Sequence, residues 1–308
     1  MATITAKDVA ALRAKTGIGM MECKKALVEA EGDMDKAITI LREKGELKAQ
    51  SKMETRIAAD GIVDVLTEGA KTAIVEVNTE TDFVAKNETF KAFVKNLLKC
   101  IIETNPADVE ALLASNYEGT TVDAKLKELI FQIGEKITIR RFAIVEGVTS
   151  TYIHGMGSIG VIVKFDTDCA DKDGFAEFAK NIALQVGAYP TPYLNRESVP
   201  ASVIENEKAI LLTQIANDPA NANKPDNIKE KMVLGKIGKF YENNCLVDME
   251  YVKAEDHEKV SKYVANTAKA LGGSIEIASF VRFEKGEGIE KKQEDFAAEI
   301  EKLAGGNK

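Results

Sequence analysis

The sequence is poor in several residue types, and each shortage narrows the possible functions. Among 308 residues there is no tryptophan, two histidines and four cysteines, and aromatic residues make up 6%. Zinc motifs and a disulfide framework are not indicated, because the cysteines are far apart: Cys23, Cys100, Cys169 and Cys245. Four reduced thiols and a start unlike a signal peptide predict a cytoplasmic protein. Long uncharged apolar runs are missing, so we expect no membrane-spanning segment.

Length and charge set further limits. A chain of 308 residues is expected to form two or more domains. Apolar residues make up 45% of the chain, enough for sizeable cores that Ile, Val, Leu and Ala must fill. The formal net charge of -8 argues against direct binding along a nucleic acid backbone. We therefore expect a protein partner or a small ligand.

Residues 4–44 predict three short helices, because apolar residues recur at helical spacing between glycine stops. The third helix is expected to end at Gly45, and residues 46–57 to form a linker or an exposed helical tether. Three helices this short bury little surface, so they should leave an apolar patch for a partner. Met20 and Met21 suit such a patch, since thioethers adapt to irregular surfaces. The alternative is that both methionines fill the core.

An α+β core is predicted next. Two apolar runs, 62–66 and 73–77, flank a turn near Glu68–Gly69 and indicate a β-hairpin. A helix containing Phe90 and Phe93 follows. Further patterns predict helices at about 107–115 and 121–134 and a strand at 137–145.

The pattern then repeats. Strands near 151–153 and 159–165 predict a second hairpin, and a helix is expected at about 173–187. The stretch Phe90–Asn96 aligns with Phe175–Asn181, which indicates two similar hairpin-plus-helix halves.

The second half carries an insertion. Helical patterns at 201–217 and 226–242 predict an antiparallel helical hairpin between elements of this half. The segment 246–252 is expected to be a strand. The remaining patterns predict a helix at about 256–271, a strand at 275–283 and a final helix at about 289–303.

The segment Thr81–Asn87, TDFVAKN, is the strongest candidate for a functional site. It stands where the strand Ala73–Val77 passes into a helix, a junction that usually faces solvent. The carboxylate of Asp82 can disturb a metal or phosphate site on another molecule, and the ring of Phe83 can enter an apolar pocket. The alternative is that Asp82 caps the helix and Phe83 packs inward. The second half has Asp166–Cys169 at this place, so the motif is an addition to one half.

Two other patterns resemble known sites. Gly155–Gly160, GMGSIG, matches the G-x-G-x-x-G dinucleotide motif, but that motif needs a helix after it. The β-branched run Val161–Phe165 predicts a strand instead, so a hairpin turn explains the glycines. His154 and His257 have no Cys or His at ligand spacing, so neither a metal nor a cofactor is expected. The phosphate-loop motif is missing, so the chain is not expected to hydrolyse GTP or ATP.

Three stretches resemble the bacterial elongation factor Ts family: Leu12–Leu27, Thr81–Asn87, and Arg282–Lys291 with Asp295–Ala297. The likeness covers essentially the whole chain, and the insertion 189–250 is its least typical part. It implies an exchange factor, not an enzyme, that acts on the GTPase elongation factor Tu.

The resemblance also implies a division of the chain. Its parts would be a ubiquitin-associated-like three-helix module with a linker (1–54), the N-terminal half of an α+β core (55–146), the C-terminal half with the helical insertion (147–283), and a C-terminal helical module (284–308).

Partner contacts follow from the same resemblance. The implied residues are the magnesium-displacing segment Thr81, Asp82, Phe83 and Val84 and, elsewhere, Met20, Met21, His154 and Gly155. The segment would enter the GTPase domain, the methionines would contact the same domain, and the histidine–glycine pair would face the partner's last domain. The helical insertion is a candidate for self-association. Two other functions stay open: an NAD-type enzyme that uses the Gly155–Gly160 turn, and an adaptor that binds without exchange.

Overall fold

The computed structural model describes residues 4–221 and 224–290. Its first helix starts at a capping box formed by Thr5 and Asp8 and ends at Gly17, whose φ of 69° favours glycine. The predicted N-terminal module is present as three helices around a small apolar core: α1 (Ala6–Thr16), α2 (Met20–Glu29) and the first part of α3 (Met34–Thr55).

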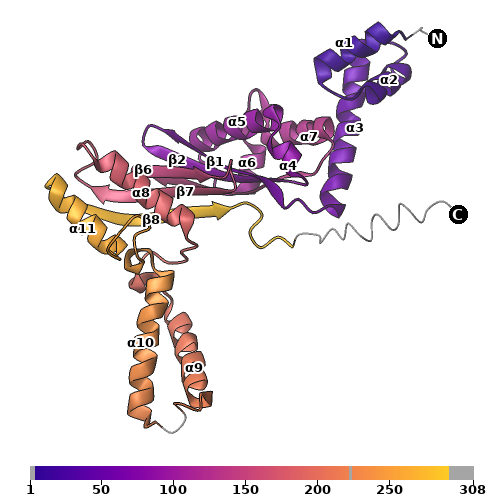
Figure 1. Cartoon of the computed structure of the whole chain (residues 1–308). Helices are drawn as coiled ribbons and strands as arrows, with labels where there is room; N and C mark the ends of the chain where they lie inside the picture. Colours follow the sequence, from indigo (N-terminus) through magenta and orange to yellow (C-terminus); the bar gives the residue numbers. More distant parts are fainter. Residues whose placement is uncertain (1–3, 222–223, 291–308) are drawn as a thin grey trace.

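Helix α3 is longer than the sequence pattern predicted, since it passes through Gly45 and continues to Thr55. A glycine inside a helix costs about 1 kcal/mol, and the good helix formers Glu, Leu, Lys, Ala and Gln at 46–50 offset that cost. The helix also packs against α7 (Val122–Ile133) of the core. The predicted end at Gly45 was therefore wrong, and the tether is helical (Figure 1).

The first half of the core is a three-stranded antiparallel sheet in the order β1-β2-β5. Helices α5 and α7 pack on one face, and Phe90, Leu97 and Ile130 lie in the resulting core. The elements of this half are β1 (Asp60–Glu68), β2 (Lys71–Thr79), α4 (Asp82–Ala85), α5 (Glu88–Thr104), α6 (Val109–Ala114), the short strands β3 (Asn116–Tyr117) and β4 (Thr120–Thr121), α7, and β5 (Ile137–Glu146).

The second half is an antiparallel sheet in the order β6-β7-β8, with α8 and α11 on its outer face. Its elements are β6 (Val148–His154), β7 (Ile159–Thr167), α8 (Phe175–Ala188), α11 (Val260–Leu271) and β8 (Ile275–Glu284). The two sheets pack against each other through Val63, Ile74 and Ile162. The result is helices, sheet, sheet, helices, and the predicted α+β class is confirmed (Figure 1).

The two halves have the same sheet topology, including a β-bulge at the same position. Strands β2 and β7 each have nine residues and lie in the middle of their sheets. Pairing with the last strand shifts register between Glu76 and Val77 in the first half, and between Lys164 and Phe165 in the second. Both shifts follow the sixth residue of the strand. A shared bulge supports duplication more strongly than the short sequence match did.

The helical hairpin is present as predicted, with α9 (Ala201–Asn217) and α10 (Asp226–Asn244) packed through a small apolar cluster. The strand predicted at 246–252 was wrong: the chain forms a short 3-10 turn, η2 (Leu246–Asp248), matching η1 (Arg196–Ser198) at the other side of the hairpin base. The backbone of 249–251 forms only an isolated bridge with 258–260. The Gln185 side chain bonds the carbonyl of Glu250 and the N–H of Val252.

After β8 the described chain crosses to the first half. Lys285 pairs with Asp60 at 2.6 Å, and the backbone N–H of Gly286 reaches Glu76. The predicted helix 289–303 lies outside the described residues from 291 on, as does most of the C-terminal module, and residues 289–290 are not helical. In the part of the chain that the structure describes, no helix is long and apolar enough to cross a membrane.

Candidate partner-binding site

The predicted site, Thr81–Asn87, forms a tight junction between β2 and α5. Helix α4 is a single turn, and Thr81 occupies its N-cap position. Val84 and Ala85 are buried in the core of the first half, which anchors one side of the turn. Asn87 caps α5, because its side chain accepts hydrogen bonds from the first backbone N–H groups of that helix. The short helix is therefore held at both ends.

Phe83 projects from the anchored turn, and 79% of its surface is exposed. The alternative in which Phe83 packs inward and Asp82 caps the helix is wrong, because the ring is outside and Thr81 is the cap residue. The benzyl group of Phe83 leaves apolar surface in contact with water, and binding to another molecule would bury that surface.

The carboxylate of Asp82 lies beside the ring and is ionised at neutral pH. Its Oδ2 atom is 2.6 Å from Nζ of Lys86, and this hydrogen bond lowers the pKa of Asp82. The same ammonium is 5.9 Å from the centre of the Phe83 ring. The turn thus carries an apolar ring and an exposed Asp82–Lys86 ion pair on its outer side.

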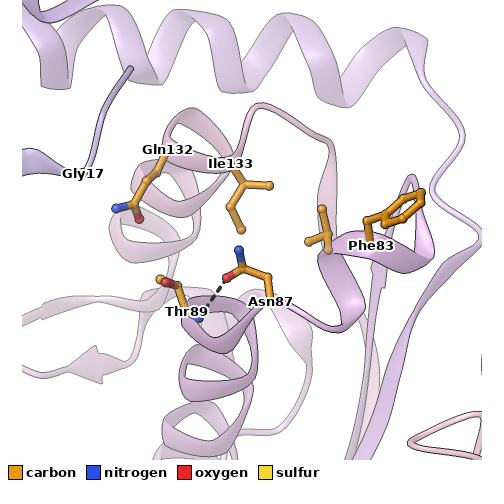
Figure 2. Close-up of a pocket in the computed structure, with 7 residues that line it drawn as sticks. Gly17, Phe83, Asn87, Thr89, Gln132 and Ile133 are labelled. Atoms are coloured by element: carbon orange, nitrogen blue, oxygen red, sulfur yellow. Dashed lines mark hydrogen bonds between the residues drawn. The ribbon is translucent and has the colours of Figure 1, made fainter. Parts of the chain in front are cut away.

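A cleft of about 430 Å³ separates this turn from the N-terminal module. Phe83 lies at one end, and Gly17, at the end of α1, lies at the other (Figure 2). The floor comes from α5 and α7, including Asn87, Gln132 and Ile133. Two parts of the chain that are distant in sequence therefore border one concave surface.

Met20 and Met21 lie on α2 of the N-terminal module, with exposures of 48% and 67%. The opposite side of this helix carries Cys23, Ala26 and Leu27, which are buried in the module core. The alternative that both methionines fill the core is wrong. They are placed on the outer face, as a partner-binding patch requires.

His154 and Gly155 form an exposed turn between β6 and β7. The turn is held against β1, because the N–H of Val63 donates to the carbonyl of Gly157 at 2.8 Å. At its tip, Met156 has a φ of 56° and is 85% exposed. A large apolar residue in this conformation and at this exposure is unfavourable for the free protein, which makes Met156 a candidate contact residue that the sequence analysis did not name.

The glycine motif at this turn serves the packing of the two sheets. A Cβ atom on Gly160 would lie 2.4 Å from Cγ1 of Val63, so the missing side chain lets the two sheets approach. Strand β7 follows the motif, whereas a dinucleotide site needs a helix there. Within residues 4–221 and 224–290, no three His, Cys, Asp or Glu side chains gather as a metal site would require.

The structure brings most of the predicted residues to one end of the core. Asp60, at the start of β1, pairs with Thr79 at the end of β2, close to α4. Lys285 bonds both Asp60 and the carbonyl of Ser158, so the β6–β7 turn lies at this end as well. The methionines of α2 stay separate, on the module beyond the cleft. Glu135 also borders the segment, since its carboxylate accepts hydrogen bonds from the N–H and the hydroxyl of Thr81, and no motif in the sequence singled it out.

Comparison with known proteins identifies the family to which this architecture belongs. The family model described as Elongation factor TS matches residues 80–287. A protein of Syntrophotalea carbinolica named Elongation factor Ts is 43% identical over 302 residues, covering 96% of this chain and 98% of the relative. Proteins of the same name from Clostridium botulinum (strain 657 / Type Ba4) and Clostridium kluyveri are each 45% identical over 307 residues, covering 97% of this chain and 98% of the relative.

Proposed function

Because the chain belongs to the elongation factor Ts family, we propose that it is a guanine nucleotide exchange factor for the GTPase elongation factor Tu in the cytoplasm. The observation that carries the proposal is the 79% exposure of Phe83 beside an ionised Asp82. The competing NAD-type enzyme is not favoured, since close sheet packing accounts for the glycine motif.

The proposed mechanism acts on the metal ion of the partner. Magnesium bridges phosphate oxygens of a bound nucleotide and neutralises their charge, so losing it weakens nucleotide binding. Phe83 enters an apolar pocket of the GTPase domain and shifts the loop that holds the ion. Asp82 adds electrostatic repulsion towards the phosphates, and neither residue coordinates the metal.

Exchange requires a large interface. Coupling between ligands is reciprocal, so the factor by which this protein weakens GDP binding equals the factor by which GDP weakens binding of this protein. A coupling of about 4 kcal/mol corresponds to roughly a thousandfold change. Since part of the binding energy distorts the partner, we expect more than about 2,000 Å² of buried surface.

We propose that separate parts of the chain supply this area. The methionine patch of α2 contacts the GTPase domain next to the Phe83 turn, across the cleft. The turn at His154 and Gly155 contacts the last domain of the partner. The division into a module (1–54), two core halves (55–146 and 147–283) and a C-terminal module (284–308) stays a proposal.

The helical hairpin has no assigned role in exchange. It exposes Ile210, Leu212 and Leu234, so self-association through this element stays a prediction. Direct nucleic acid binding is not part of the proposed function, in keeping with the net charge of -8.

Release of fluorescently labelled GDP from elongation factor Tu tests the function. An exchange factor accelerates release in proportion to its concentration until the rate saturates. An adaptor forms a complex, detected by sedimentation, without changing the release rate, and that result would refute exchange. Saturable binding of NAD to the purified chain would support the enzyme instead.

A further inference from the structure

The end of α7 and the loop that joins it to β5 contact both the N-terminal module and the Phe83 turn. Phe131 packs against the apolar core of the module. The side chain of Gln132 lies against Gly17 so closely that a Cβ atom there would be 1.9 Å from Nε2. A few residues later, Glu135 reaches Thr81 at the base of α4. A short stretch of chain thus contacts two elements to which we assign partner contacts.

Glu135 holds Thr81 by two hydrogen bonds. The backbone N–H of Thr81 donates to Oε2 at 3.0 Å, and its hydroxyl donates to Oε1 at 2.8 Å. The carbonyl of Thr81 in turn accepts the hydroxyl of Thr79 at 2.8 Å. An N-cap threonine usually accepts a hydrogen bond from its own helix. Here the hydroxyl is engaged by Glu135, and a four-residue helix cannot be stable by itself.

A second set of contacts joins the same loop to the end of α3. The guanidinium of Arg56 lies 3.1 Å from Oε2 of Glu80. Oε1 of Glu80 accepts the backbone N–H of Lys136, and Nζ of Lys136 donates to the carbonyl of Arg56 at 2.7 Å. The helix that carries the module and the strand that leads to Phe83 are therefore fastened to one loop.

The second half provides an internal comparison. There the carboxylate of Asp168, directly after β7, accepts the N–H of Ser274 at 2.7 Å, in the loop before β8. Its counterpart in the first half is Glu80, directly after β2, which accepts the N–H of Lys136 before β5. The next residue is the fully buried Cys169 in the second half and Thr81 in the first half, where Glu135 bonds it two residues before the exposed Phe83. The Glu80 contact therefore belongs to the repeated fold, and the Glu135 contact is added in the half that carries the exposed ring.

We propose that Glu135 is a positioning residue that presents Phe83 in a fixed direction relative to the N-terminal module. This inference rests on the proposed exchange function. A ring fixed before contact loses less conformational entropy on binding, so more of the binding energy remains to distort the partner. Without Glu135 the Thr81 side chain can rotate so that its oxygen accepts from the N–H groups of α4, and we expect the turn to settle in a different orientation.

The test compares variants in stopped-flow release of labelled GDP from elongation factor Tu over a range of protein concentrations. Glu135→Ala should lower the maximal release rate about tenfold, equivalent to about 1.4 kcal/mol, with a much smaller change in half-saturating concentration. Glu135→Gln should restore most of the rate, because its amide can accept from the N–H and donate to the hydroxyl of Thr81. Glu128→Gln, which removes an exposed carboxylate from α7, is the control.

A double variant separates positioning from general stability. If Glu135 acts through the ring, Glu135→Ala should add little to the defect of Phe83→Ala. A full additional tenfold loss in the double variant, or a normal rate for Glu135→Ala alone, overturns the positioning role. A normal rate for Phe83→Ala overturns the exchange mechanism together with it. Thr81→Val, which keeps the backbone N–H, should give an intermediate rate and covers the case in which Glu135→Ala fails to fold.

Discussion

The backbone N–H of Gly286 donates a 2.8 Å hydrogen bond to Oε1 of Glu76, a carboxylate whose side chain is fully buried. The same carboxylate accepts from the guanidinium groups of Arg140 at 2.9 Å and Arg141 at 2.6 Å. Arg140 is the extra residue at the bulge of the first sheet. A buried acid therefore joins the middle strand, the bulge and the segment that follows the last strand.

Replacing this acid should destabilise the protein. Glu76→Gln removes the buried charge that pairs with Arg140 and Arg141 and leaves Arg141 with the exposed Glu287. We therefore expect a loss of about 2–3 kcal/mol in the free energy of unfolding. Urea unfolding followed by circular dichroism measures it. Glu146→Gln, on β5 and largely exposed, is the matched control and should change the free energy by less than about 0.5 kcal/mol. Equal stability of both variants would show that the buried network contributes little.

The contribution of Glu76 should depend on pH. Burial alone would raise its pKa, but hydrogen bonds from Gly286, Arg140, Arg141 and Asn78 outweigh burial and lower it below the ordinary value of 4.5. A group with a lowered pKa stabilises the fold above its ordinary pKa, and the stabilisation is lost as pH falls through the folded-state value. The difference in unfolding free energy between the wild type and Glu76→Gln should thus be constant near neutrality and shrink below about pH 4.5. A difference that grows on acidification would contradict this sign.

The α2 methionines should contribute to affinity without contributing to stability. Met20→Ala with Met21→Ala removes exposed side chains, so the melting temperature should change little. Affinity for nucleotide-free elongation factor Tu, measured by calorimetry, should fall about tenfold. Val28→Ala on the same helix, also exposed, serves as the control. Unchanged affinity of the double variant would remove the methionine patch from the interface.

Met156 should contribute to affinity at a cost to stability. Its φ of 56° suits glycine, so Met156→Gly should leave stability unchanged or raise it by up to about 1 kcal/mol. If the exposed side chain contacts the partner, affinity for elongation factor Tu should nevertheless fall severalfold. A variant that is equally stable or more stable and binds as tightly as the wild type would exclude this contact.

The sequence predicted what depends on local patterns. Alternation and turn residues located both hairpins, and helical periodicity located α5, α8 and the inserted hairpin. The junction at Thr81–Asn87 could be recognised because an acid and a large aromatic residue stand where a strand passes into a helix. Contacts distant in sequence could not be recognised in this way.

Errors arose where tertiary contacts decide the structure. Gly45 predicts the end of a helix, yet α3 packs against α7 and continues beyond this residue. The pattern of 246–252 predicts a strand, yet its backbone bonds are divided between an isolated bridge to 258–260 and the side chain of Gln185. Glu135 gives no sequence signal, because its role comes from Thr81, 54 positions away. The bulges became visible only when the strands were paired.

The most direct test of the central claim is the release of labelled GDP from elongation factor Tu by the wild type and by Phe83→Ala. Truncating an interface hot spot costs about 2 kcal/mol or more, so the maximal release rate should fall roughly thirtyfold or more. Leu234→Ala, which removes an exposed apolar side chain from the distant helical hairpin, should release GDP at the wild-type rate. A wild-type rate for Phe83→Ala would contradict the account, because exchange would then not need the exposed ring.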